Sequence, residues 1–239
     1  MDFDPNRRPY PSLRYPIYAN RGMVAASSPQ ASAAGLQALR SGGNAVDAAV
    51  AAAATLTVTE PTANGIGGDA FALVWIEKDR RLYGLNASGR APSGISIEAV
   101  LARNPPGERM PALGWLPVLV PGIPKAWASL VRRFGRRSLG EALEPAAEYA
   151  EGGYPAGPVL AGAWERSFDR YSRECRGPEF AEWFRVFAPE GRPPAPGRIV
   201  RLPDHARTLR SLGASDSESF YRGDLADRIV RDSEEFGGF

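Results

Sequence analysis

The sequence has very few of the side chains that most often carry nucleophilic, redox or metal chemistry. Its 239 residues include one cysteine, Cys175, and one histidine, His205. A single cysteine excludes a disulfide framework within the chain. Because no group of histidine, cysteine, aspartate and glutamate has metal-ligand spacing, we expect neither a metal nor a cofactor.

Long apolar runs and nucleotide-binding or hydrolase signatures are also missing. No stretch is long and apolar enough to cross a membrane, and residues 1–22 lack the apolar core of a signal peptide. We therefore expect a soluble protein with no membrane partner, cytoplasmic if Met1 is the native start. Neither a phosphate loop ending in Gly-Lys-Ser/Thr nor a Gly-x-Ser-x-Gly nucleophile elbow occurs.

The charge is nearly balanced, with 29 basic and 27 acidic residues and a formal net charge of +2. The densest basic cluster lies at the end of a predicted helix, where cations interact favourably with the helix dipole. With no recognition motif beside it, this cluster predicts a solvated helix end and no nucleic-acid partner. Its members are Arg132, Arg133, Arg136 and Arg137.

The single histidine and cysteine have no visible catalytic partners. His205 falls in the first turn of a predicted helix, which favours a surface histidine of depressed basicity. Cys175 lies in a polar run whose arginines would lower the pKa of a thiol, yet an incidental thiol is the better interpretation. Neither residue is predicted to be catalytic.

Local signals predict two helices near the front of the chain. Residues 1–20 are rich in proline, arginine and tyrosine and predict an extended N-terminal arm, followed by a strand at 23–27. Ser28 and the proline after it predict a helix start, and that helix should end at residues 41–43. Asn44 should cap the second helix, with Asp47 in its first turn.

After a glycine-rich turn at residues 64–69, two runs rich in aromatic and bulky apolar residues predict a hairpin. They are 71–77 and 81–88, with the charged residues 78–80 as the tip. The remainder reads as mostly helical, and proline and glycine at 185–201 predict a connector. The predicted helices are 96–103, 123–134, 138–152, 156–168, 203–213 and 222–235.

The glycines of the turn, Gly65, Gly67 and Gly68, match a relaxed dinucleotide-binding pattern. That pattern needs a strand before the glycines and a helix after them, whereas here a helix precedes and a strand follows. We therefore expect a tight turn with positive φ, with Asp69 structural beside it. A nucleotide-binding enzyme remains a distant third hypothesis.

The second predicted strand ends in a polar segment at residues 86–92 that contains Arg90. The planar fork of an arginine suits bidentate capture of a carboxylate. An arginine that pairs with an acidic neighbour on the surface is an equally good interpretation of the local sequence.

Several segments occur in a characteristic order and spacing. The most specific is Gly-Gly-Asn-Ala-Val-Asp-Ala-Ala at 42–49, followed by Glu-Pro at 60–61 and Gly-Ile-Gly-Gly at 65–68. From about residue 20 to the end, the chain resembles the opening of the γ-glutamyltransferase family. Weaker matching pieces are residues 23–28, 120–122, 144–146, 152–155, 220–223 and 237–238.

The resemblance implies an N-terminal-nucleophile hydrolase with an α/β fold, the four-layer αββα sandwich. Residues 21–239 would form an incomplete large-subunit portion that supplies strands and mostly outer helices. Such proteins are made as precursors that cut themselves and free a threonine, whose α-amino group activates its hydroxyl for attack on an amide carbonyl. No Thr-Thr-His-like start is present, so we expect no catalytic residue in this chain. The resemblance implies two partners: a small subunit or remainder of the precursor that carries the threonine, and a small-molecule γ-glutamyl or acyl amide substrate.

One departure from the family bears on the substrate. Members specific for γ-glutamyl groups carry an arginine for the substrate carboxylate, and alignment on Ala91 and Pro92 sets Ser88 at that position. Arg90 follows two residues later, on the same face of an ordinary strand. The expected substrate-binding residues are therefore Arg90, Ser88 and Asn86.

The resemblance thus predicts transfer of a γ-glutamyl or related acyl group from an amide to water or an amine. Two alternatives stay open. One is an acylase or peptidase of the same family with a non-glutamyl substrate, and the other is a non-catalytic scaffold fragment.

Overall fold

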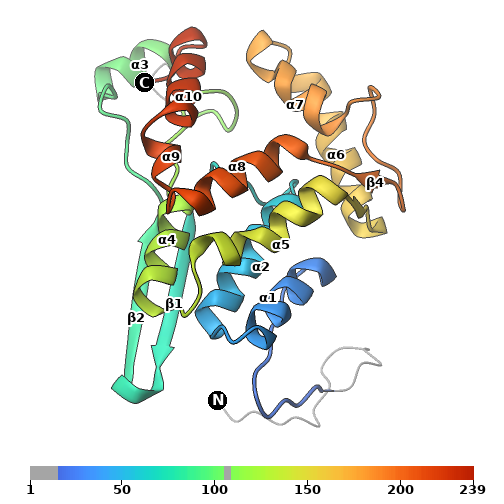
Figure 1. The fold of residues 1–239 in the computed structure, drawn as a ribbon. Coiled ribbons are helices and arrows are strands. Elements are labelled where there is room, and N and C mark those ends of the chain that lie inside the picture. The colour runs from blue at the N-terminus through green and yellow to red at the C-terminus, as the bar shows by residue number, and fades with distance from the viewer. Residues whose placement is uncertain (1–15, 105–108) are drawn as a thin grey trace.

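The structure, a computed structural model, describes residues 16–104 and 109–239. The described chain is α/β and mostly helical, with four strands in two antiparallel pairs (Figure 1). The predicted arm at 1–20 lies mainly outside the described residues, and residues 16–20 of it are exposed and form no helix or strand. The helices are α1 Pro29–Arg40, α2 Ala45–Thr59, α3 Ile97–Arg103, α4 Ile123–Phe134, α5 Leu139–Gly152, α6 Pro158–Glu174, α7 Ala181–Phe187, α8 Pro203–Ala214, α9 Glu218–Tyr221 and α10 Asp224–Glu235.

The caps of α1 and α2 are confirmed. The Ser28 hydroxyl accepts a hydrogen bond from the backbone N–H of Ala31 at 3.1 Å, directly before the proline that starts α1. Asn44 and Asp47 form a reciprocal capping box at the start of α2. These local contacts fix where each helix begins, so the sequence was sufficient to place both.

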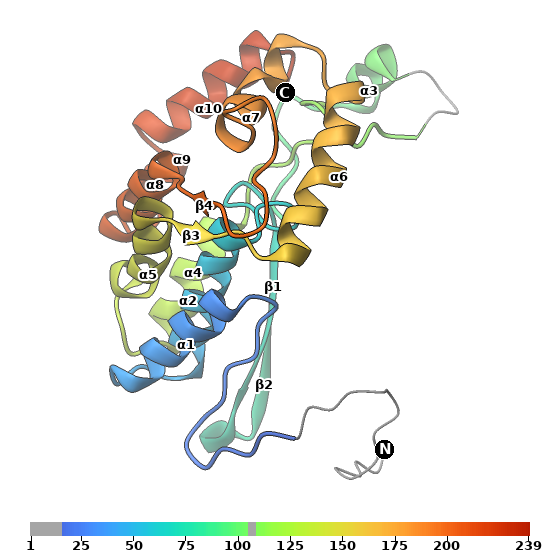
Figure 2. The same ribbon diagram turned by 90° about the vertical axis from the view of Figure 1, so that its right-hand side faces the viewer.

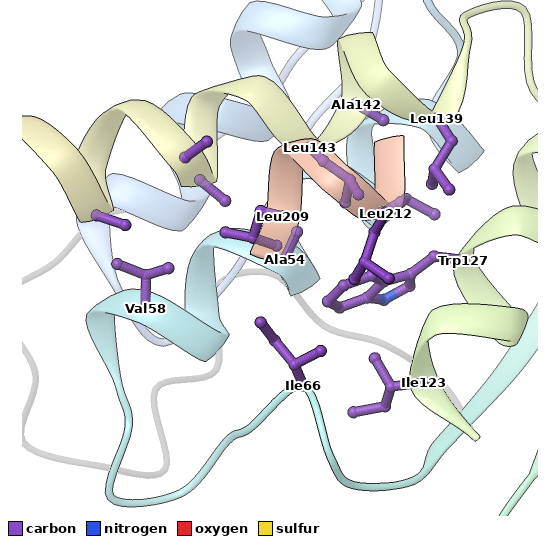
Figure 3. Close-up of a cluster of buried hydrophobic side chains, with 14 of the residues drawn as sticks. Ala54, Val58, Ile66, Ile123, Trp127, Leu139, Ala142, Leu143, Leu209 and Leu212 are labelled. Atoms are coloured by element: carbon purple, nitrogen blue, oxygen red, sulfur yellow. The ribbon is translucent and has the colours of Figure 1, made fainter. Parts of the chain in front are cut away.

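The core lies where α2, α4, α5 and α8 meet (Figures 1 and 3). Trp127 of α4 packs there with Leu209 and Leu212 of α8, and Ile66 of the glycine-rich turn closes one side. Alanines of α2 and α5 allow these helices to approach closely, which explains why α2 is buried on most of its circumference.

A buried carboxylate ties two helix–helix turns together. Asp47 is fully buried, and it accepts hydrogen bonds from the backbone N–H groups of Asn44 at 2.7 Å, of Arg136 at 3.0 and 3.1 Å, and of Arg137 at 3.2 Å. The side-chain amide of Asn44 also donates to the carbonyl of Phe134 at 2.6 Å. The start of α2 is thereby fixed against the α4–α5 turn.

Strands β1 (Ala70–Ile76) and β2 (Arg81–Ala87) form the predicted hairpin, which extends away from the helices in Figure 2. Their register runs from Ala70 opposite Ala87 to Ile76 opposite Arg81. One face is half-buried near α4, where the rings of Tyr83 and Phe134 lie 5.1 Å apart.

Two expectations for the rest of the chain need correction, and two helices were not predicted. Residues 23–27 alternate in exposure but form no strand, because no other described segment pairs with them. The connector predicted for 185–201 contains the end of α7 and the short strand β4 (Ile199–Val200), which pairs with β3 (Tyr154–Pro155). Helices α7 and α9 were not predicted from the sequence.

None of the described helices is both long and apolar enough to cross a membrane. The described helices form one body, and the β1–β2 hairpin projects from it (Figure 2).

Candidate functional site

Three segments of backbone converge at the open end of the hairpin. The carbonyl of Gly68 accepts hydrogen bonds from the N–H groups of Gly122 at 3.0 Å and Ile123 at 3.2 Å. The carbonyl of Arg90 accepts one from the N–H of Val120 at 2.9 Å. The glycine-rich turn, the end of β2 and the start of α4 are therefore held in one fixed arrangement.

Two glycines make this close approach possible. A Cβ atom on Gly122 would lie 2.0 Å from the carbonyl oxygen of Ala87, and one on Gly89 would lie 2.1 Å from that of Val120. Gly89 also has φ +87°, a conformation that other residues rarely adopt. No larger residue fits either position without moving the backbone.

The three predicted binding residues lie at this end of the hairpin, within five residues of one another in the sequence. Ser88 is half-buried, Asn86 and Arg90 are exposed, and the Asn86 side-chain oxygen accepts a hydrogen bond from the N–H of Ser88 at 2.9 Å. The assumption of an ordinary strand through Arg90 is wrong, because β2 ends at Ala87 and Gly89 breaks the alternation. Arg90 is consequently not a simple two-residue shift of Ser88 along one face.

The glycine-rich turn differs from its prediction in backbone conformation, in packing and in the exposure of Asp69. None of Gly65, Gly67 and Gly68 has positive φ. A Cβ atom on Gly65 or Gly67 would meet nothing within 4 Å, so close packing is not what requires these two glycines within the described chain. Asp69, expected to be structural, is exposed, and no side-chain hydrogen bond or ion pair between described residues involves it.

One face of the hairpin, the open face, is apolar and uncovered within the described chain. Phe71, Leu73 and Trp75 of β1 are 66%, 76% and 50% exposed, and Leu82 of β2 is 55% exposed. Side chains at alternate positions share a face, so Asn86 belongs to the same face at its inner end. The polar residues thus lie at the end of a large apolar surface.

His205 and Cys175 do not contribute to this arrangement. His205 was expected on a helix surface, but it is half-buried with its ring 5.9 Å from that of Phe187, and burial lowers its pKa while Asp204 opposes the shift. Cys175 is buried, and desolvation raises the pKa of its thiol, contrary to the lowering expected from nearby arginines. A raised pKa makes this thiol a poor nucleophile.

A cavity of about 580 Å³ lies between the α4–α5 turn and the end of α8. Three members of the basic cluster, Arg132, Arg136 and Arg137, line it. The predicted solvated helix end agrees with the exposure there, where Arg132 pairs with Asp216 and Arg137 pairs with Glu141 at 2.7 Å. Gly122 lies at the start of α4, and the cavity lies at the end of that helix. A helix of this length spans about 18 Å, so the cavity is remote from the hairpin end. We therefore treat the hairpin end, and not this cavity, as the candidate site.

Comparisons with known proteins fit this arrangement. The described fold superposes on the crystal structure of cephalosporin acylase from Bacillus halodurans with a TM-score of 0.92 and 50% identity, over 100% of this chain and 44% of that one. The Helicobacter pylori γ-glutamyltranspeptidase gives a TM-score of 0.84 at 27% identity, over 94% of this chain and 63% of the other. The fold is thus that of N-terminal-nucleophile hydrolases.

The sequence comparisons are more specific. The family model for gamma-glutamyltranspeptidase matches residues 31–239, and the chain belongs to this family. It is 34% identical to the glutathione hydrolase proenzyme of Bacillus subtilis (strain 168), over 91% of this chain and 36% of that protein. It is also 34% identical to the acylase ACY 1 proenzyme of Pseudomonas sp. (strain V22), over 88% of this chain and 38% of that protein. The chain therefore spans little more than a third of the length of these curated relatives.

Proposed function

We propose that this chain is the front part of an amidohydrolase that moves a γ-glutamyl or related acyl group from an amide to water or an amine. The observation that carries the proposal is the polar segment at residues 86–90, whose backbone is held to Val120 at the hairpin end, in a chain that matches the family over residues 31–239. Arginine beside hydroxyl and amide groups suits recognition of a carboxylate.

The nucleophile in this proposal is an N-terminal threonine from outside this chain. Its hydroxyl oxygen attacks the amide carbonyl carbon, and its own α-amino group takes the hydroxyl proton and then passes it to the departing amine. Water or a second amine attacks the resulting ester and releases the acyl group. The role of this chain is to bind the donor and orient its carbonyl.

In this scheme Arg90 binds the carboxylate of the acyl donor, and Ser88 and Asn86 offer weaker polar contacts. The tight backbone at Gly89 and Gly122 supports that role, because it fixes the origin of the Arg90 side chain. A rigid origin reduces the entropy lost when a long side chain binds its ligand.

An acylase acting on a non-glutamyl donor is the second candidate. Two observations favour it: Ser88 occupies the position at which the resemblance expects an arginine, and the cephalosporin acylase shares 50% identity with this chain. A scaffold without catalysis is the third, and it predicts that no threonine-led polypeptide accompanies this chain.

We further propose that the remainder of a precursor covers the open face of the hairpin. The relatives matched by sequence are proenzymes more than twice as long as the matched region. Phe71, Leu73, Trp75 and Leu82 together present an apolar surface of a size that soluble proteins normally bury.

The test uses the protein expressed from its complete gene. N-terminal sequencing should find a second polypeptide that begins with threonine, and a chromogenic γ-glutamyl anilide should be hydrolysed. Arg90→Ala should abolish most of this activity, whereas Arg81→Ala, an exposed arginine at the other end of the hairpin, should not. Threonine-led processing without anilide release would move the substrate to another acyl group, and no second polypeptide would refute the catalytic proposal.

A further inference from the structure

Helix α4 begins without a side-chain cap of its own. Its N-cap residue is Gly122, which has no side chain to accept a hydrogen bond. A capping serine or aspartate cannot replace it, because a Cβ atom at this position would lie 2.0 Å from the carbonyl oxygen of Ala87. The N–H groups of the first helical turn must therefore find acceptors elsewhere in the chain.

Tyr221 of α9 supplies one of these acceptors. Helix α9 lies beside the start of α4 (Figure 1), and the Tyr221 hydroxyl accepts a hydrogen bond from the backbone N–H of Lys125 at 3.2 Å. The same hydroxyl donates to the carbonyl of Pro121 at 2.7 Å. The side chain is half-buried, and burial raises the pKa of Tyr221, so its hydroxyl keeps the proton that it donates. One side chain thus binds the backbone on both sides of the α4 N-cap.

The residue that Tyr221 binds lies between two backbone contacts of the hairpin end. Val120, directly before Pro121, donates its N–H to the carbonyl of Arg90 at 2.9 Å. The residue directly after Pro121 donates to the glycine-rich turn at 3.0 Å. The Tyr221 hydroxyl is therefore attached one residue away from the hydrogen bond that holds the backbone of Arg90.

A second contact joins the same two helices but is weaker. Lys125 of α4 and Glu218 of α9 form an ion pair, and both side chains are about half exposed. Solvent screens such a pair, and it contributes little to holding the two helices together. The half-buried hydroxyl of Tyr221 is consequently the stronger of these two links between α9 and the start of α4.

We propose that Tyr221 is a positioning residue for the candidate site, which acts through Pro121 and Val120 on the backbone of Arg90. The inference rests on the proposed function, because that function assigns Arg90 to the acyl donor. Tyr221 takes no part in the bond changes and restricts the segment at 120–122. A looser segment would place Arg90 correctly for only part of the time, and the affinity for the donor would fall by that fraction.

The first test is Tyr221→Phe in the protein expressed from its complete gene, which removes the hydroxyl and keeps the ring. KM for γ-glutamyl-p-nitroanilide should rise about 3- to 10-fold, as for loss of one hydrogen bond, while kcat stays within about 2-fold. A purely structural effect gives the opposite result, because fewer folded molecules lower the apparent kcat and leave KM unchanged. An unchanged KM in Tyr221→Phe would overturn the proposal.

The matched control is Tyr154→Phe. The Tyr154 hydroxyl donates to the carbonyl of Val58 at 2.7 Å, the same length as the bond from Tyr221 to Pro121, but its side chain lies in the core. Loss of this bond should lower the thermal midpoint and leave KM unchanged. An equal rise of KM in both variants would mean that general destabilisation is the cause, and it would also overturn the proposal.

Hydrogen exchange separates this inference from the proposed function. If the complete protein hydrolyses no γ-glutamyl anilide, the proposed γ-glutamyl donor fails, and the exchange of the Val120 amide tests Tyr221 without turnover. Mass spectrometry of peptides that cover residues 118–123 should find exchange about 3- to 10-fold faster in Tyr221→Phe than in the unmodified protein. Exchange in Tyr154→Phe should be slower than in Tyr221→Phe. Equal exchange in the unmodified protein and in Tyr221→Phe would overturn the inference.

Discussion

The carboxylate of Asp47 accepts two hydrogen bonds, at 3.1 and 3.0 Å, from the backbone N–H of Arg136, which lies 89 residues further along the chain. Removing this fully buried carboxylate should destabilise the complete protein, because Asp47→Ala takes the acceptor from the backbone N–H groups of Asn44, Arg136 and Arg137. We expect a loss of about 3 kcal/mol in the free energy of unfolding, measured by urea denaturation. Asp47→Asn keeps one acceptor oxygen and should lose less.

The matched control for Asp47 is Asp79→Asn at the exposed tip of the hairpin. This variant removes the same charge from a side chain that, among the described residues, accepts one side-chain hydrogen bond, from the Tyr83 hydroxyl at 3.3 Å. If Asp79→Asn lowered the free energy of unfolding as much as Asp47→Asn does, the role assigned to Asp47 would be contradicted.

Gly135 is required by the same arrangement. A Cβ atom there would lie 2.5 Å from an Asp47 carboxylate oxygen and 2.7 Å from the carbonyl oxygen of Val131. Gly135→Ala should therefore cost about 1 to 3 kcal/mol and lower the thermal midpoint. In Gly152→Ala the new Cβ meets nothing within 4 Å, so an equal loss there would show that steric contact is not the cause.

His205 should make stability depend on pH. Burial holds its pKa below the ordinary 6.5, with Asp204 opposing the shift, so the unfolded chain binds a proton more readily than the folded one. The contribution of neutral, buried His205 to the free energy of unfolding is therefore fully present above pH 6.5. It is lost as the pH falls below that value toward the pKa of His205 in the folded protein. Denaturation at pH 7.5 and 5.5 should show a larger loss for the unmodified protein than for His205→Gln. Identical losses would mean that His205 does not titrate differently on folding.

Cys175 should react slowly with iodoacetamide in the folded protein. The thiol is buried and its raised pKa leaves little thiolate near pH 8. Peptide mass spectrometry should find it labelled rapidly only after urea is added, and faster at higher pH in the folded state. Rapid labelling of the native protein at pH 8 would contradict this environment.

The sequence predicted those features that depend on neighbouring residues. Ser28 and Asn44 cap their helices through contacts within three residues, so composition and spacing were enough. The hairpin was also predictable, because its two strands and charged tip are contiguous. The pairing of β3 with β4 joins Tyr154 to Val200, and no local pattern announces a partner so far away.

Part of the candidate site could be predicted, because its polar residues are near neighbours in the sequence. Asn86, Ser88 and Arg90 follow one another in sequence, so their grouping could be seen directly. The hydrogen bonds that join Gly68 to Gly122 and Arg90 to Val120 could not be predicted, because each pair lies far apart in the sequence. The positive φ expected at residues 65–68 occurs instead at Gly89, where a carbonyl group of another segment crosses.

The open face of the hairpin also bears on how the protein is made. A ribosome adds about 5–20 residues per second, so Phe71, Leu73, Trp75 and Leu82 emerge many seconds before the last helices of this chain. During that interval they are a template for aggregation between nascent chains. The charged run at 78–81, with Lys78 and two arginines beside one aspartate, forms the hairpin tip and the first residue of β2, and it acts as a gatekeeper against such pairing. Replacing this run with apolar residues would therefore lower the yield of soluble protein in cells while leaving the folded hairpin intact.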